Sequence, residues 1–173
     1  KKAAATSMGS KLVAEYKEYL ADLAVKAMLA VAEKHDGAYK ADVDDVKVEK
    51  KTGESLGETS LSNGIVLDKE IVHSGMPKRL EKAKIALLEA SLENEKPEMD
   101  AKISIESPEQ IEAFLKQEET MLKDMVEKVL ASGANVIICQ KGIDDMAQHF
   151  LARRGVIAIR RAKKSDMEKL ARA

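Results

Sequence analysis

The first part of the chain carries the hydrophobic period of an amphipathic helix over residues 7–34. Ser7 or Ser10 can cap the start of this helix. Gly37 is expected to end it, because glycine readily adopts the left-handed conformation that terminates helices. The apolar stripe of the predicted helix consists of Leu12, Tyr16, Leu20, Leu23, Ala27, Ala30 and Val31.

The middle of the chain has the patterns of β-strands. Residues 45–51 alternate between apolar and polar side chains, and residues 64–72 are rich in β-branched residues. Residues 83–93 carry apolar side chains on both faces, a pattern that fits either a helix or a buried strand. The strand is favoured. Alternation returns over residues 99–107, which predicts a further strand.

A second long helix is predicted to run from Pro108 to Ser132. Ser107 is a suitable cap, Pro108 suits the first helical position, and Gln110 completes a capping box. Gly133 is expected to end the helix.

The apolar stripe of this second helix is interrupted at Glu118. Either a buried helix carries a local polar break, or the second half docks on the core while the first half projects into solvent. The second interpretation is favoured, and it predicts an exposed apolar patch of the kind that marks interaction sites. The patch would consist of Ile111, Phe114 and Leu115, and the docked half would use Leu122, Met125, Val126 and Val129.

The last third of the chain alternates between strands and helices. Strands are predicted over residues 134–140 and 156–161, and helices over residues 143–154 and 164–173, the last one opened by Ser165. This order, with short turns, indicates a parallel βαβα unit and therefore an α/β fold. The chain begins just before one helix and ends within another, so both ends are expected to be cut from a longer protein.

Composition narrows the class of protein. The 173 residues are 34% charged, yet the formal net charge is −1, which gives no overall electrostatic footprint for nucleic acid. The single cysteine, Cys139, excludes an internal disulfide framework and a cysteine-rich zinc site. No apolar run reaches the ~18 residues of a membrane helix, and no signal peptide is recognised, so no membrane partner is expected and a cytoplasmic location is predicted.

The helix over residues 143–154 is the first candidate for chemistry. Its predicted core stripe consists of Ile143, Met146, Ala147, Phe150 and Leu151. Asp145 and His149 would face solvent beside Ala152, flanked by Gln148 and Arg153. An Asp–His pair one turn apart can supply two metal ligands, but a zinc site needs three or four. An exposed face that binds a partner is therefore favoured over a metal or catalytic site, and Cys139 is expected to pack as a small hydrophobic residue.

A nucleotide site is the second candidate. The turn "QKGIDD" after the strand at 134–140 has one glycine and two acids, and acids at a helix start repel phosphate. From the residues alone, a partner-binding α/β domain is favoured, and a small-ligand or nucleotide-binding α/β enzyme domain is the alternative.

Three segments make a more specific identification possible. "SGANVIICQKGIDDMAQHFLARRGVIAIRRAKKSDMEKLARA" (132–173) strongly resembles the apical domain of group II chaperonins, and the archaeal form of that family is the nearest. "GIVLDKEIVHSGMPKRLEKAKIALLEASLE" (64–93) resembles the entry into that domain. "TSMGSK" (6–11), followed by a long helix, resembles the segment that leads into the family's intermediate domain.

The resemblance implies a domain organisation. Residues 1–61 would be the N-terminal segment of an intermediate domain, and residues 62–173 an apical domain of sheets flanked by helices. The helical protrusion would span about residues 97–121. The family's Gly-Asp-Gly-Thr phosphate motif does not occur in this sequence, so no cofactor and no ATPase activity are expected of this chain, although the full-length parent would use ATP and Mg. Lys11 matches the lysine of the family's nucleotide-sensing loop.

The resemblance also implies a function. The chain would be the polypeptide-binding and lid-forming part of an ATP-dependent chaperonin, with unfolded polypeptides as substrates and sister subunits of a double ring as partners. The patch Ile111, Phe114 and Leu115 would belong to the lid, and the outer face of the 143–154 helix would line the substrate groove. Alone, the chain is expected to be a monomer.

Overall fold

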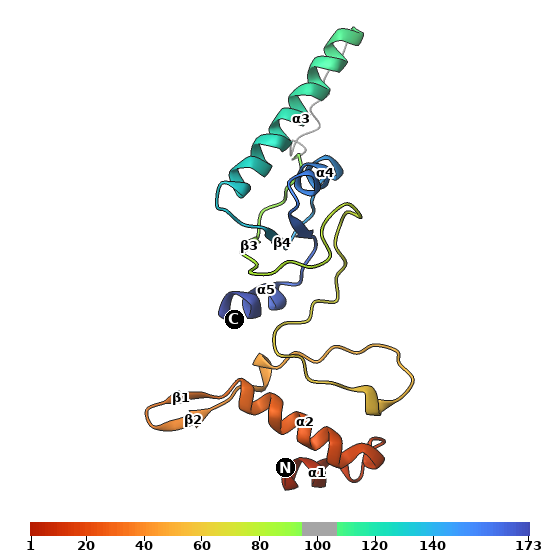
Figure 1. Ribbon diagram of the computed structural model, residues 1–173, viewed down its shortest axis with the longest axis vertical. Coiled ribbons are helices and arrows are strands. Elements are labelled where there is room, and N and C mark those ends of the chain that lie inside the picture. The colour runs from red at the N-terminus through yellow and green to blue at the C-terminus, as the bar shows by residue number, and fades with distance from the viewer. Residues whose placement is uncertain (95–106) are drawn as a thin grey trace, which may run out of the picture. The chain divides into compact units, whose positions relative to one another are not determined.

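The computed structural model of the protein describes residues 1–94 and 107–173, which form two compact units (Figure 1). The first unit comprises Lys1–Asp68 together with Ala173, and the second comprises Lys69–Arg172. The boundary predicted between residues 61 and 62 stays a prediction. Apart from Ser107, the strand predicted over residues 99–107 lies outside the described residues, and so does the start of the protrusion predicted from residue 97.

The first unit begins with two helices where one was predicted. Helix α1 spans Lys2–Met8, a 3₁₀ turn (η1) spans Ala14–Tyr16, and α2 spans Lys17–Ala30. The single helix over residues 7–34 is therefore wrong at both ends. Gly9 and Ser10 lie at the break, where glycine is flexible and serine competes for backbone hydrogen bonds. Leu12, predicted in the apolar stripe, is fully exposed in this break.

A β-hairpin follows α2. Strand β1 (Glu33–His35) pairs antiparallel with β2 (Ala38–Lys40). Asp36 and Gly37 connect the strands with φ values of 48° and 82°. A two-residue hairpin loop with both φ values positive favours Asp-Gly, because glycine pays no steric penalty there. Gly37 is left-handed as predicted, but it turns a hairpin rather than ending a helix.

The rest of the first unit contains two capped 3₁₀ turns. The first (η2) spans Val43–Asp45, with Asp42 accepting a hydrogen bond from the Asp44 amide at 3.0 Å. The second (η3) spans Leu56–Glu58 and is capped by Ser55. The strands predicted over residues 45–51 and 64–72 are wrong, since neither segment forms a strand among the described residues. A strand requires a hydrogen-bonded neighbour, which a sequence pattern cannot supply.

The second unit is built on a three-stranded parallel sheet. The strands are β3 (Ile85–Leu88), β4 (Val136–Cys139) and β5 (Ile157–Ile159), in the order β3-β4-β5. Ile85 pairs with Val136, and Val136 pairs with Ile157. This arrangement confirms the predicted strand within residues 83–93 and the parallel βαβα unit. All four residues of β4 are buried, as expected for the central strand of a parallel sheet.

Three helices accompany the sheet. They are α3 (Pro108–Leu130), α4 (Asp145–Arg153) and α5 (Lys164–Arg172). The Ser107 hydroxyl accepts from the Gln110 amide at 3.4 Å, and Gly133 is left-handed just beyond the end of α3, as predicted. Helix α5 begins at Lys164, just before its predicted opening residue. None of the helices in the described part of the chain is long and apolar enough to cross a membrane.

The core of the second unit lies between the sheet, α4 and the inner half of α3. Leu122 and Val126 of α3 are 3% and 2% exposed, and they join one cluster with Ile137 of β4 and with Ala147 and Leu151 of α4. Residues four apart on a helix share one face, so Leu122 and Val126 together fix the rotation of α3. The inner half of α3 is therefore held by packing.

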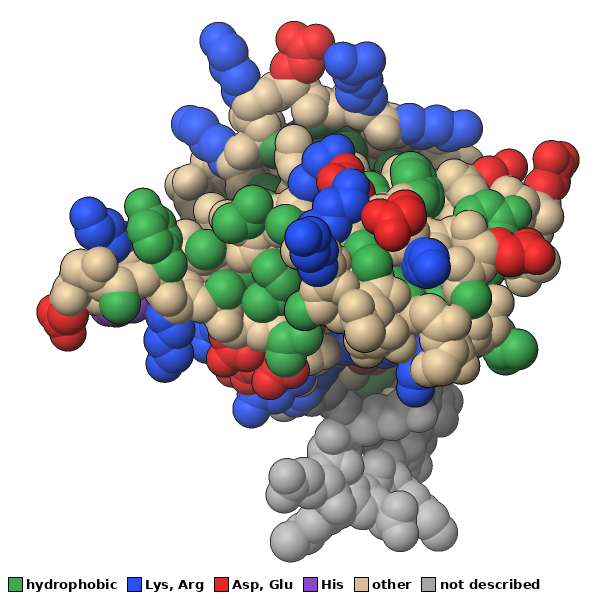
Figure 2. Space-filling view, turned by 90° about the horizontal axis from the view of Figure 1, so that it is seen from below, with side chains coloured by type: hydrophobic (Ala, Val, Ile, Leu, Met, Phe, Trp, Pro, Cys, Tyr) green, Lys and Arg blue, Asp and Glu red, His purple; other side chains and the backbone are tan. Residues whose placement is uncertain are grey.

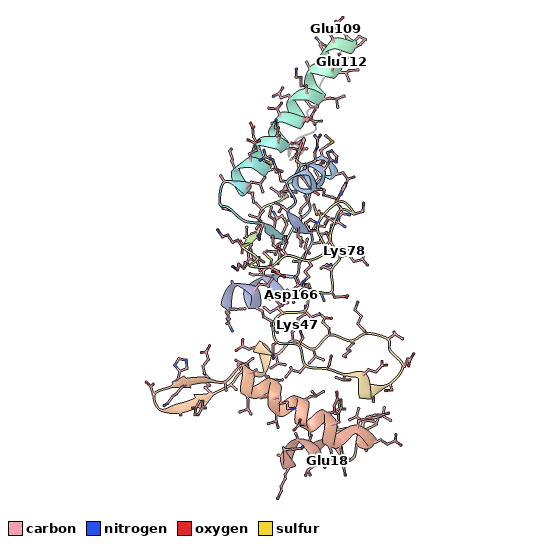
Figure 3. The ribbon with its side chains drawn as sticks, in the orientation of Figure 1. Glu18, Lys47, Lys78, Glu109, Glu112 and Asp166 are labelled. Atoms are coloured by element: carbon pink, nitrogen blue, oxygen red, sulfur yellow. The ribbon has the colours of Figure 1, made fainter. Side chains whose placement is uncertain are left out.

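The outer half of α3 projects away from this core (Figure 1). Ile111, Phe114 and Leu115 are 47%, 38% and 57% exposed. Glu109 and Glu112 lie at the end of the helix that is remote from the sheet (Figure 3). The projecting interpretation is thus confirmed for the described residues, and the patch Ile111, Phe114 and Leu115 (hereafter the α3 patch) is exposed.

Replacing all three residues of the α3 patch with Ser should leave the melting temperature almost unchanged, because exposed substitutions usually alter the free energy of unfolding by less than about 0.5 kcal/mol each. Leu122→Ala, on the buried half of the same helix, should cost about 2–5 kcal/mol. Thermal and urea denaturation followed by circular dichroism measure both. A large loss in the triple variant would show that the outer half of α3 is packed.

Candidate functional site

The outer face of α4 presents polar and apolar side chains to solvent. Asp145, His149 and Arg153 are exposed, as predicted. Ala152 is half-buried and packs against the core. Met146 is 43% exposed, so its assignment to the core stripe is wrong. Helix α4 is only nine residues long and contributes mainly Ala147 and Leu151 to the core, which leaves Met146 free at its first turn.

Gln148 does not belong to this outer face. It is 4% exposed, and its Nε2 donates to Ile143 O at 2.8 Å and to Asp145 Oδ1 at 3.0 Å. The prediction that Gln148 lies on the solvent-facing side of the helix is therefore wrong. A buried amide group needs hydrogen-bond partners, and the Ile143 carbonyl just before the helix supplies one. Gln148 thus anchors the start of α4.

A histidine from a distant loop lies against α4. The rings of His73 and His149 are 6.0 Å apart between centroids, at an angle of 64°. The Gly75 amide donates to His73 Nδ1 at 3.0 Å, which orients the ring. Sequence reasoning missed this neighbour, because the turn at 73–77 gives no indication of the element on which it packs.

These side chains do not form a metal centre in the described part of the chain, where no group of three His, Cys, Asp or Glu residues is placed to hold an ion. The Asp145 carboxylate accepts from Gln148 and lies 4.0 Å from Arg160 Nη1. His73 Nδ1 accepts a hydrogen bond from the Gly75 amide.

Cys139 is the remaining candidate nucleophile, and it is fully buried. Its Sγ lies 3.1 Å from Ala90 O, and burial raises the pKa of the thiol. A raised pKa leaves little thiolate, which is the reactive form. The prediction that Cys139 packs as a small hydrophobic residue is confirmed.

The candidate site of the second unit therefore consists of two exposed surfaces. Helix α3 approaches α4 through its inner half, where Glu127 Oε1 lies 3.4 Å from Nη2 of Arg154, the residue after α4. The α3 patch lies on the outer half. The two surfaces are the α3 patch and the α4 face, which comprises Asp145, Met146, His149 and Arg153 with His73 alongside.

The first unit has its own features. Lys11 is exposed in the turn between α1 and η1. An apolar groove of about 370 Å³ is lined by Ala4, Ala24, Val25, Met28, Leu29, Ala32, Tyr39 and Ala41. It offers few polar groups that would orient a small ligand. Over the face drawn in Figure 2, apolar side chains (green) lie among both basic (blue) and acidic (red) side chains.

Comparisons with known proteins cover the whole chain. The model of the TCP-1/cpn60 chaperonin family matches residues 1–173. Thermosome subunit beta of Saccharolobus shibatae is 60% identical over 173 residues, and the thermosome subunit of Pyrococcus abyssi is 58% identical over 172 residues. These matches cover 100% and 99% of this chain. The chain spans 31% of the length of each of these curated relatives.

A solved chaperonin structure is also similar to this chain. The open-state monomer of a group II chaperonin from Methanococcoides burtonii superposes with a TM-score of 0.75 at 38% identity. The match covers 98% of this chain and 36% of that one.

The anchoring role of Gln148 predicts a stability effect. Gln148→Ala leaves the buried Ile143 carbonyl without its donor and should lower the free energy of unfolding by about 1–3 kcal/mol. His149→Ala, next to it on the exposed face, should change that free energy by less than about 0.5 kcal/mol. Urea denaturation of both variants tests the pair, and equal stabilities would contradict the burial of the Gln148 amide.

The burial of Cys139 predicts a protected thiol. A disulfide reagent such as dithionitrobenzoate should release almost no colour from the folded chain at neutral pH, because the raised pKa and the packing both limit the thiolate. Addition of denaturant should release one equivalent at once. Rapid reaction of the folded protein would show that the strand opens.

Proposed function

The chain belongs to the TCP-1/cpn60 chaperonin family, and from this membership we propose that its second unit is the polypeptide-binding, lid-forming apical part of an ATP-dependent group II chaperonin. The observation that carries the proposal is the exposure of the α3 patch on a helix whose other half is locked into the core. Three large apolar side chains exposed on a rigid helix mark an interaction site.

The lid role rests on the anchoring of the inner half of α3 in the core. The buried pair Leu122 and Val126 ties the helix to the sheet, so its outer half can transmit a movement of the second unit to a distant contact. In a full-length ring, the α3 patches of neighbouring subunits would meet over the chamber.

The α4 face is proposed as a second contact for unfolded polypeptide. Met146 is exposed there, and methionine is flexible enough to fit many sequences. His73 is added to this face because of its ring contact with His149. Each contact would be weak alone, and a ring of subunits would gain avidity by presenting several.

Nucleotide chemistry is assigned to the full-length protein rather than to this chain. ATP and Mg would bind in the parent, with Lys11 as a sensor of the nucleotide. The chain itself is proposed to be monomeric, cytoplasmic and without enzyme activity. The alternative, a nucleotide-binding enzyme domain, is disfavoured because Asp144 caps α4 with its carboxylate, and phosphate would have to displace it.

Calorimetric titrations of this chain separate the two functions. A reduced, unfolded protein such as reduced lactalbumin should bind weakly, and Mg-ATP should give no binding heat, because the family's phosphate motif is absent from this sequence. Serine at all three positions of the α3 patch should weaken polypeptide binding several-fold, since exposed apolar contacts supply its affinity.

A matched control replaces three exposed apolar residues of the first unit, Leu29, Val43 and Val48, with Ser. This variant should keep the polypeptide affinity of the wild type. Equal losses in both triple variants, or tight binding of Mg-ATP, would contradict the proposal. Sedimentation of the same samples checks that the binding species is a monomer.

A further inference from the structure

The carboxyl edge of the three-stranded sheet gathers exposed cations. Because β4 and β5 are parallel, the segments that follow them leave the sheet at the same edge. The Arg161 amide donates to Lys141 O at 2.9 Å, and the Ala162 amide donates to Cys139 O at 3.0 Å. These bonds hold the two loops side by side. The carboxyl-edge cations brought together in this way are Lys141, Arg160, Arg161, Lys163 and Lys164, all exposed.

Two acids follow β3 at the same edge: Glu89 is exposed, and the Glu93 carboxylate lies against Gly142. Residues 146–165 contain six Lys and Arg and no Asp or Glu. At the start of α4, Asp144 accepts from the Met146 amide, and Asp145 lies 4.0 Å from Arg160. In the part of the chain that the structure describes, the other four carboxyl-edge cations have no ion-pair contact.

Arg161 has a left-handed backbone conformation, which is unfavourable for a residue that carries a Cβ. Its φ is +55°, where residues with a Cβ are uncommon and glycine is favoured. Conformations of this kind persist where surrounding contacts impose them, and they cluster at functional sites. Here the hydrogen bond to Lys141 O holds the Arg161 backbone beside the loop that follows β4.

We propose that the carboxyl-edge cations bind acidic segments of unfolded polypeptide. This inference rests on the proposed polypeptide-binding function and adds a preference among substrates. Guanidinium groups pair with carboxylates through two parallel hydrogen bonds, and lysines on flexible stems adapt to carboxylates at irregular spacing. A run of Asp or Glu in an unfolded chain therefore matches this exposed surface.

The same surface suits phosphate less well. A compact phosphate needs converging backbone amides, as at a helix start. The start of α5 already holds Asp166 in its first turn, and that side chain is 4% exposed. A carboxylate so close to the positive end of the helix disfavours a second anion there. An extended row of carboxylates needs only the exposed side chains.

Three fluorescent peptides of equal length and equal apolar content test the preference. One carries runs of Glu, one runs of Gln and one runs of Lys, and each is titrated by anisotropy with the full 173-residue chain. The Glu peptide should bind about tenfold more tightly than the Gln peptide near 50 mM salt, and most of that advantage should vanish near 300 mM through screening. The Lys peptide should bind most weakly.

Two variants and one control locate the effect. K163E/K164E should remove the advantage of the Glu peptide and leave the Gln peptide within about twofold. R161G removes the guanidinium and relieves the left-handed backbone, so it should weaken the Glu peptide without loss of thermal stability. K17E/K40E makes the same charge change at exposed positions of the first unit and should leave the preference intact.

The outcomes separate this inference from the proposed function. If the Glu and Gln peptides bind equally tightly, and both bind more weakly to the α3 patch variant, the proposed function stands and the acidic preference is overturned. Binding of the Glu peptide alone keeps the preference and overturns the apolar contact. No binding by any peptide overturns both. Tighter, salt-dependent binding of a single-stranded oligonucleotide than of the Glu peptide would make the surface a nucleic-acid site and overturn the inference.

Discussion

The pairing of β4 between β3 and β5 is the constraint on which the second unit depends. All four residues of β4 are buried, and the strand receives hydrogen bonds on both edges from parallel neighbours. Parallel neighbours require long crossovers. The crossover from β3 to β4 contains α3, and the one from β4 to β5 contains α4. The helices with the candidate surfaces are thus the connections that the sheet makes necessary.

The crossover explains how an apolar patch can be exposed on a stable unit. Helix α3 is longer than the sheet that it covers, so only its inner half finds a partner in the core. Leu122 and Val126 supply that anchor, and the remaining turns extend beyond it. A short helix would have buried its whole apolar stripe. Length beyond the core is what leaves part of the apolar stripe exposed here.

Polar groups hold together the segments at the carboxyl edge of the sheet, away from the projecting half of α3. Asp144 caps α4, Gln148 satisfies the Ile143 carbonyl, and Arg161 donates to the loop after β4. Each of these contacts joins groups at the carboxyl edge of the sheet. Of these side-chain contacts, the bond from Gln148 is buried, and a buried amide group must be paired. This edge carries exposed cations before α5, and His73 lies beside α4.

The sequence by itself determined the elements whose cause is local. The order Ser107-Pro108 with Gln110 fixed the start of α3, and the break at Glu118 divided its stripe into a docked and a projecting half. The alternation of the last third gave the parallel unit. Tertiary structure alone decided which extended segments became strands. It also decided that the Gln148 side chain is buried while Met146 is exposed, and that the ring of His73 packs near that of His149. Strand pairing and side-chain burial depend on neighbours distant in the chain, and hydrophobic periodicity carries no information about those neighbours.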